Sequence, residues 1–101
     1  MVAGDRENNN MKIKIEKRYS SETRLEGEAE SFKEFVIKNK SDLRGSNLRD
    51  SDLRDSDLRG SDLSGSDLSD SNLSDSDLRW AKIKASQKDE LLKALRIEII
   101  D

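Results

Sequence analysis

Leucine recurs at every fifth position from Leu43 to Leu78, always between small and polar residues. The five-residue words are SDLRG, SNLRD, SDLRD, SDLRG, SDLSG, SDLSD, SNLSD and SDLRW, and AKIKA follows with isoleucine in the leucine position. In an α-helix successive leucines would lie about 140° apart and scatter around the helix. In a continuous strand they would alternate between two faces, because five is an odd number. Neither element gathers the leucines on one side.

A bend inside every word removes this difficulty, because each bend turns the next leucine inward again. If each bend is about 90°, four words close a coil of about 20 residues, and the next coil stacks on it at about 4.8 Å. Sequences with a fixed period generally stack units that cannot bury their apolar side chains alone. The pattern therefore predicts a solenoid.

The words resemble those of the pentapeptide-repeat family: a small residue, Asp or Asn, Leu or Phe, a polar residue, and often Gly. The resemblance covers residues 41–85 and implies a mainly β fold, a right-handed quadrilateral β-helix of about two coils. It implies a core of Leu43, Leu48, Leu53, Leu58, Leu63, Leu68, Leu73, Leu78 and Ile83. It also implies inward-facing small residues at Ser41, Ser46, Ser51, Ser56, Ser61, Ser66, Ser71, Ser76 and Ala81. We expect these serines to hydrogen-bond turn backbone or each other, because an unpaired buried hydroxyl is costly. Gly45, Gly60 and Gly65 lie where a turn can require positive φ.

The chain before the words predicts a leader and a paired-strand element. Residues 1–10 are polar and predict a disordered leader. Apolar residues at Met11, Ile13 and Ile15 alternate with charged ones and predict a half-buried strand, which Tyr19 extends. Residues 23–26 predict a return strand.

A short helix completes the predicted N-terminal cap, residues 11–40. Ser31 and Glu34 have the spacing of a capping box, in which each satisfies the other's exposed amide. Phe32, Phe35 and Val36 share one face, which predicts a helix over 32–39 that covers the first coil.

Residues 86–101 predict a C-terminal helical cap. The segment 86–89 reads SQKD, a second helix-start signal, and Leu91, Leu92, Leu95 and Ile99 form an apolar stripe. Residues 97–100 form a strand in the alternative interpretation. Trp80 is expected to pack beneath the helix. The face made of Trp80, Leu91, Leu92 and Leu95 covers the last coil or pairs with a second copy in a dimer, and the two roles are compatible.

Composition argues against enzymatic and metal chemistry. There is no Cys and no His, so thiol chemistry, the usual general base and the commonest zinc ligand are missing. No phosphate-binding glycine loop or nucleophile elbow is present, and we expect no cofactor, no metal site and no enzyme. Asp50 and Asp52 begin like a calcium-binding loop, but Arg54 and Asp55 break its pattern; loose Ca²⁺ binding by stacked carboxylates remains the alternative. The repeat could also be interpreted as a disordered Ser-Asp tract, but the apolar residue in every word argues against this, since a solvated tract has no use for it.

No apolar run of signal-peptide or transmembrane type is found, so the default expectation is the cytoplasm, or the host cytoplasm for a phage-encoded protein.

The net charge of −3 is unevenly spread, because residues 41–80 contain ten Asp and five Arg. Stacking words four apart places Asp50 over Asp70 and Asp55 over Asp75. Four arginines, Arg44, Arg49, Arg54 and Arg59, belong to the first coil, and serines replace three of them in the second. The coil 61–80 is therefore expected to be the more acidic. The candidate partner-binding residues are Asp50, Asp52, Asp55, Asp62, Asp67, Asp70, Asp75 and Asp77.

This charge predicts a binding function. A net charge of −5 over two coils is about one charge per 2 Å of rise, close to the one per ~1.7 Å of duplex DNA. Members of the family the words resemble are DNA mimics that block DNA gyrase, and acidic phage proteins block restriction or CRISPR complexes. Two coils match only about three base pairs, which favours a small acidic plug for a defence complex over a gyrase inhibitor.

The alternatives are gyrase inhibition or protection, an oligomerisation scaffold acting through residues 91–100, and aspartates that only solubilise the repeat. The expected partner is a protein that normally binds nucleic acid. The chain itself is expected to contact neither nucleic acid nor a membrane. The basic residues Lys12, Lys14, Lys17 and Arg18 form either a solvated strand face or a second contact patch.

Overall fold

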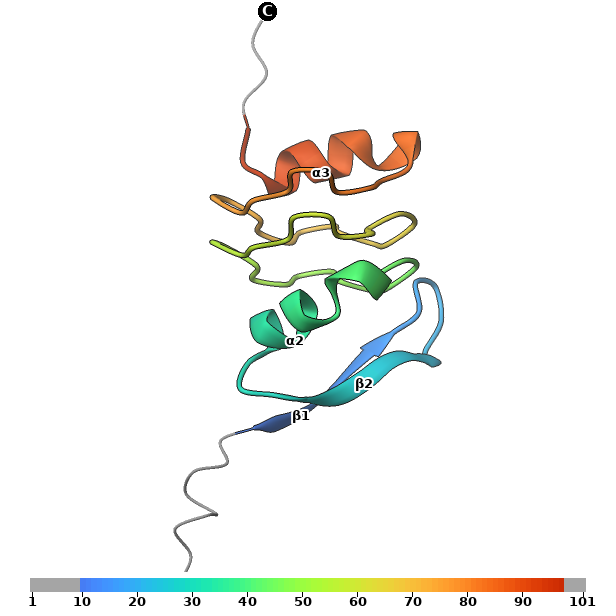
Figure 1. Ribbon diagram of the computed structural model, residues 1–101. Helices are drawn as coiled ribbons and strands as arrows, with labels where there is room; N and C mark the ends of the chain where they lie inside the picture. Colours follow the sequence, from blue (N-terminus) through green and yellow to red (C-terminus); the bar gives the residue numbers. More distant parts are fainter. Residues whose placement is uncertain (1–9, 98–101) are drawn as a thin grey trace, which may run out of the picture.

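The computed structural model describes residues 10–97 of the chain. A hairpin at one end is followed by a helix, a stack of coils and a second helix at the other end (Figure 1). The predicted leader, except Asn10, lies outside the described residues, as do Ile99 and most of the alternative strand at 97–100.

The hairpin pairs β1 (Met11–Glu16) with β2 (Thr23–Ala29) in antiparallel register, with Ile13 opposite Gly27. The alternation predicts the buried side chains correctly at Ile13 and Ile15. Met11 is half exposed at 47%, and the expectation that Tyr19 extends this face is wrong, since Tyr19 is 87% exposed. Tyr19 lies in the turn after β1, so the strand alternation no longer sets its direction.

The helix α2 (Phe32–Lys38) begins where the sequence predicts and ends one residue earlier. The Ser31 hydroxyl accepts a hydrogen bond from the Glu34 amide at 3.1 Å, which is one half of the predicted capping box. Phe35 and Val36 are buried, and Phe32 is partly buried against the same core. The helix lies between the hairpin and the first coil (Figure 1), and beside it the hairpin contacts the coil directly, since the Asn47 amide donates to the Glu16 carbonyl at 2.8 Å.

Successive coils stack in parallel. Isolated bridges join Asn47 to Asp67, Asp52 to Asn72 and Asp57 to Asp77, each pair 20 residues, or four words, apart. Leu48, Leu53 and Leu58 donate their amides to the carbonyls of the coil above at 2.8–2.9 Å. Seven leucines are completely buried: Leu43, Leu48, Leu53, Leu58, Leu63, Leu68 and Leu73. The repeat region therefore forms the stacked β-helix that the period predicts, and its right hand and square cross-section stay predictions. Leu78 and Ile83, also expected in the core, are only partly buried, because they lie in the last words of the stack.

Every word turns at its fifth residue. This residue has φ between 59° and 74° in all eight words. The prediction is confirmed for Gly45, Gly60 and Gly65, and aspartate or Trp80 takes the same conformation elsewhere. Aspartate is among the few non-glycine residues that enter this region readily.

The small serines of the words differ in their hydrogen bonds. Ser56, Ser66 and Ser71 donate to the carbonyl three residues earlier at 2.6–2.7 Å, as expected for hydroxyls that bond turn backbone. The buried hydroxyls of Ser46 and Ser61 have no partner among the described residues. Ser41 is exposed, contrary to prediction, because its word begins in the 3₁₀ helix η1 (Lys40–Asp42).

The C-terminal cap consists of the 3₁₀ helix η2 (Ala85–Gln87) and α3 (Lys88–Ala94). The start signal predicted at Ser86 is wrong, since α3 begins two residues later behind the buried Gln87. Leu91 and Leu95 pack against the core as predicted; the fully buried residue of the helix is Ala94, not Leu92.

The helix ends in a Schellman motif. Arg96 has positive φ and donates to Lys93, and the Ile97 amide donates to Leu92. This turn closes the apolar stripe after Leu95.

The cap also satisfies backbone groups that a solenoid leaves open at its end. The Gln87 side chain accepts from the amides of Gly65 and Lys84 and donates to the carbonyls of Leu63 and Ser66, all within 2.9 Å. Further along the same edge, a Glu90 carboxylate oxygen accepts from the Leu68 amide, and the Ala94 carbonyl accepts from the Leu73 amide. The helix therefore terminates the ladder as well as covering the leucines.

Candidate binding surface

The second residue of each word has a structural role. Its side-chain oxygen accepts the amide of the fourth residue in seven of the words, beginning with Asn47 and Arg49 and ending with Asp77 and Arg79. Asn and Asp make this local turn equally well, because both offer an acceptor oxygen at the same position. The turn therefore accounts for an aspartate or asparagine at this position without any partner.

The fifth residue has no such bond to make. Four of these residues are aspartates, Asp50, Asp55, Asp70 and Asp75, and all four are exposed; we call them the acidic corners. Glycine takes the same backbone conformation at other words, so the fold does not require a carboxylate here.

The acidic corners form two stacked pairs on neighbouring edges of the β-helix. The Asp50 amide donates to the Ser69 carbonyl at 3.0 Å, and the Asp55 amide donates to the Ser74 carbonyl at 3.1 Å. These bonds place each first-coil corner beside the second-coil corner above it, as the four-word period predicts. Asp70 contacts Arg49 at 3.8 Å, and no ion pair is found for Asp50, Asp55 or Asp75 in the described part of the chain.

The other four candidate aspartates are engaged with neighbouring side chains. Asp52 lies between the two edges and pairs with Arg54 at 2.7 Å. Asp62 accepts a hydrogen bond from the Ser64 hydroxyl, on the side of the β-helix that carries Arg44 and Lys82. The Asp67 side chain is only 14% exposed and accepts a hydrogen bond from the Ser69 hydroxyl. Asp77 pairs with Arg79 at 2.7 Å. Six of the eight predicted residues thus belong to two neighbouring stacks of words, Asp50, Asp52, Asp55, Asp67, Asp70 and Asp75, whereas Asp62 and Asp77 belong to the other two stacks.

Arginines of the first coil reach the second. Arg49 lies 3.8 Å from both Asp67 and Asp70, and Arg59 lies 3.9 Å from Asp77. The arginines of the first coil therefore offset part of the negative charge of the second coil, which the sequence analysis did not predict.

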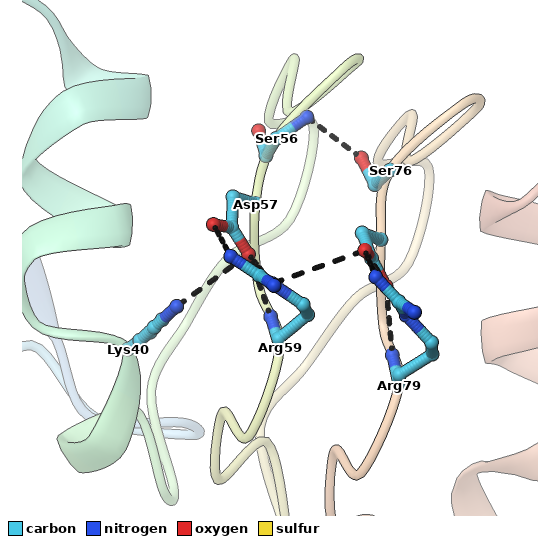
Figure 2. A network of polar contacts seen from close by, with 7 residues as sticks. Lys40, Ser56, Asp57, Arg59, Ser76 and Arg79 are labelled. Carbon is cyan, nitrogen blue, oxygen red and sulfur yellow. Dashed lines mark hydrogen bonds and ion pairs between the residues drawn. The ribbon is translucent and has the colours of Figure 1, made fainter.

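The face of the fourth and eighth words is electrically balanced. Figure 2 shows Lys40, Asp57, Arg59 and Arg79 in one chain of contacts, in which Arg59 pairs with Asp57 at 2.7 Å. Lys40 approaches Asp57 at 3.6 Å from η1. Each carboxylate on this face has a cation beside it, so the face offers no free negative charge.

The arginine contacts shift the pKa values of these aspartates. Hydrogen bonds from the Arg54 side chain lower the pKa of Asp52 from 3.8 to about 2. Hydrogen bonds from the Arg59 side chain lower the pKa of Asp57 well below its usual range, and a hydrogen bond from Arg79 lowers the pKa of Asp77. These carboxylates stay ionised through the physiological range, but their charge is already paired.

The predicted cap or dimer face separates into two parts. Leu91 and Leu95 pack on the core, whereas Trp80 is 75% exposed and does not pack beneath α3 as expected. Trp80 is the fifth residue of its word, with φ 63°, and the turn directs its ring outward, where the Arg79 guanidinium lies 5.5 Å from the ring centre.

Comparison with known proteins identifies the repeat. Residues 41–79 match the family model for pentapeptide repeats in eight copies. No curated protein and no solved structure matches the chain. Among residues 10–97, no helix is long and apolar enough to cross a membrane, and no His, Cys, Asp or Glu cluster suited to a metal ion is found.

Proposed function

Because residues 41–79 belong to the pentapeptide-repeat family, we propose that this chain is a non-enzymatic protein that binds the nucleic-acid site of a partner through its acidic corners. One observation carries the proposal. The second-position aspartates of the seven turns are engaged with neighbouring arginine or serine side chains, but Asp50, Asp55 and Asp75 are exposed, unpaired in the described residues, and not needed by the fold.

The spacing of these charges supports mimicry of a nucleic-acid backbone. Stacked coils repeat at about 4.8 Å, and a DNA strand carries one phosphate per ~3.4 Å of helix axis. Two parallel columns of carboxylates on neighbouring edges therefore present charge at a density that a phosphate-binding surface can accept. The rigid backbone ladder beneath them fixes the columns before binding, which lowers the ordering cost.

The size of the surface favours one kind of partner. Two coils rise about 10 Å, the length of about three base pairs. A surface this short fits a confined groove for DNA or guide RNA better than a long DNA saddle. A CRISPR effector or a restriction enzyme is the first choice, and DNA gyrase is the second.

A second candidate function is a scaffold or homodimer contact. The observation that favours it is Trp80, which is 75% exposed at a turn where small or polar residues occur in the other words. An exposed tryptophan beside an arginine is typical of residues that dominate protein interfaces.

The test replaces the four acidic corners together, Asp50→Asn, Asp55→Asn, Asp70→Asn and Asp75→Asn. Asparagine has the same shape and tolerates positive φ, so the turns are kept while four charges are removed. The matched control removes four carboxylates from the N-terminal cap, Glu26→Gln, Glu28→Gln, Glu30→Gln and Glu34→Gln. Both variants and the wild type are used to capture partners from host lysate, and captured proteins are identified by mass spectrometry.

The proposal predicts that a nucleic-acid-binding complex is captured by wild type and control and is lost with the corner variant. Capture should also weaken at high salt, because exposed charges are screened. If the corner variant still captures the complex, and Trp80→Ser or Leu91→Ala/Leu95→Ala loses it at unchanged stability, mimicry is refuted and the scaffold function is favoured.

A further inference from the structure

A second charged surface lies where the hairpin turn meets the first corner of the β-helix. Five cationic side chains, Lys17, Arg18, Arg24, Arg44 and Lys84, line a hollow of about 470 Å³ together with Tyr19; we call it the basic hollow. Among residues 10–97, no Asp or Glu lines it. The hollow exists because the Arg18 amide donates to the Gly45 carbonyl at 2.8 Å and fixes the turn on this edge.

The cations of the basic hollow are not all neutralised. Lys17 pairs with Glu22 at 2.9 Å, and Arg24 pairs with Asp42 at 2.7 Å. Across residues 10–97, neither Arg44 nor Lys84 forms an ion pair. The surface therefore keeps two cations that are not held in an ion pair, next to the edges that carry the acidic corners.

Arg18 forms part of the wall of the hollow. Its Nη1 donates to the carbonyls of Gly65 and Ser66 at 3.3 Å, so the guanidinium is held in place by backbone. Its Nε is buried and has no hydrogen-bond partner among the described residues. The charge of Arg18 is therefore fixed beside the hollow, where it adds to the attraction for an anion.

Tyr19 provides a strained, exposed aromatic ring at the same place. It has φ 67° in a turn closed by the Ser20 amide and the Lys17 carbonyl, a position that favours Gly or Asn. A bulky residue there stores strain, yet the ring is 87% exposed and gains no burial in return. The Arg18 guanidinium lies 4.7 Å from the ring centre on one face and leaves the rest of this exposed ring to solvent.

The repeat itself leaves this edge open. The corner residues below the hollow are Gly45 and Gly65, and a side chain at Gly45 would meet nothing within 4 Å. The next two corners along the chain carry aspartate in both coils. A lack of room for a side chain therefore does not explain the glycines. Their effect is that this edge carries no corner carboxylate and stays positive.

We propose that the basic hollow binds a phosphate-bearing nucleotide unit, with the base stacked on Tyr19 and the phosphate held by Arg44 and Lys84. Aromatic stacking combined with cations is how proteins hold unpaired bases. The same chemistry is offered by a free nucleotide and by the end of a single strand. The inference goes beyond the proposed function of the acidic corners and departs from the expectation of no direct nucleic-acid contact. The edges with the acidic corners would face the partner protein, and the neighbouring edge with the basic hollow would hold a nucleic-acid strand that the partner binds.

The test is fluorescence anisotropy of a labelled, 5′-phosphorylated single-stranded oligothymidine titrated with the full chain at low salt. The hollow variant is Arg44→Gln/Lys84→Gln, and the matched control, Lys12→Gln/Lys14→Gln, removes the same charge from exposed positions of β1. A second pair separates stacking from strain: Tyr19→Asn removes the ring at a position that suits Asn, and Tyr19→Phe keeps it.

The hollow variant should bind about tenfold more weakly or worse, and its slope of log K against log salt should fall by about 0.7, for one phosphate that is no longer neutralised. Tyr19→Asn should lose about fivefold or more, and Tyr19→Phe should bind like wild type. Competition by a mononucleotide at equal affinity would assign a free nucleotide, and competition only by unlabelled strand would assign a strand end.

The inference is overturned if wild type does not bind, if the hollow variant binds like wild type, or if the control pair weakens binding equally. The corner variant carries four fewer negative charges and an intact hollow, so it should bind the oligonucleotide at least as well as wild type. Loss of partner capture by that variant is therefore a separate outcome, and either proposal can fail alone.

Discussion

Gln87 closes the open end of the second coil, so replacing it should weaken the whole β-helix. The side chain is 2% exposed and lies between the last complete coil and α3. The substitution Gln87→Met keeps a flexible chain of similar length in the same space and removes both the acceptor and the donor. Hydrophobic packing is thus largely kept, and the lost hydrogen bonds dominate the effect.

The size of the effect follows from the partners that remain. The Leu63 carbonyl keeps the Ser66 amide at 3.0 Å and its hydroxyl at 2.7 Å, so it stays satisfied without Gln87. The Gly65 and Lys84 amides lose the oxygen that accepts from them at 2.7 and 2.8 Å. Two amides left without an acceptor cost about 2–4 kcal/mol in total, at ~1–2 kcal/mol for each partly exposed group.

Urea denaturation followed by far-UV circular dichroism measures this loss as a change in the free energy of unfolding. Trp80 is too exposed to report the transition by fluorescence. The matched control is Lys88→Met at the exposed neighbouring position, which should stay within about 0.5 kcal/mol of wild type. A Gln87→Met protein as stable as this control would refute the reasoning that α3 terminates the backbone ladder.

Further substitutions test the serines, one ion pair and one turn. Ser66→Ala should lower the free energy of unfolding by about 1 kcal/mol, because its buried hydroxyl donates at 2.7 Å. Ser61→Ala should leave the free energy of unfolding unchanged or raise it, because that hydroxyl has no partner among the described residues; urea denaturation compares the two. Arg54→Gln should raise the pKa of Asp52 from about 2 toward 3.8 in a carboxyl NMR titration. Since the folded-state pKa is the lower one, the stability from this pair is complete above pH 3.8 and lost as pH falls toward 2, so Arg54→Gln and wild type should converge in acid. Asp55→Ala should destabilise by about 1 kcal/mol at φ 60°, and Asp55→Gly should not; equal effects in thermal denaturation would contradict the turn argument.

The fold could be predicted where one period dominates. A leucine at every fifth position excludes helix and strand, and the buried column from Leu43 to Leu73 follows from that geometry. The α2 helix was predictable because the Ser31 cap and the Phe35–Val36 face agree with each other. Local chemistry and burial favoured the same elements at these places, so the sequence was sufficient.

Side-chain direction was harder to predict where residue type and position disagree. Trp80 and Tyr19 are large and aromatic, which suggests burial, but both lie in turns with positive φ that direct them outward. Gln87 is polar and follows the last word, and no periodicity marks it as the residue that completes the coil. Its burial depends on four backbone groups that come together only in the folded chain.

The candidate site could be predicted only in part. The sequence shows that aspartate is abundant, but a carboxylate that holds a turn and one that is free for a partner look identical in a word such as SDLRD. The structure separates them, since Asp52 accepts from Arg54 and Asp55 accepts from no side chain that the structure describes. The basic hollow was not predictable as a unit, because it joins residues from the hairpin turn, two coils and the segment before η2.

Competition between this protein and duplex DNA for one captured partner tests the central claim most directly. The partner is bound to the immobilised chain, and unlabelled duplex DNA is added in steps while release is measured. If the acidic corners occupy the nucleic-acid site, DNA should release the partner completely, with a midpoint that follows the partner's own affinity for DNA. A stable complex that contains the chain, the partner and the DNA together, through contacts that survive the four corner substitutions, would contradict the account.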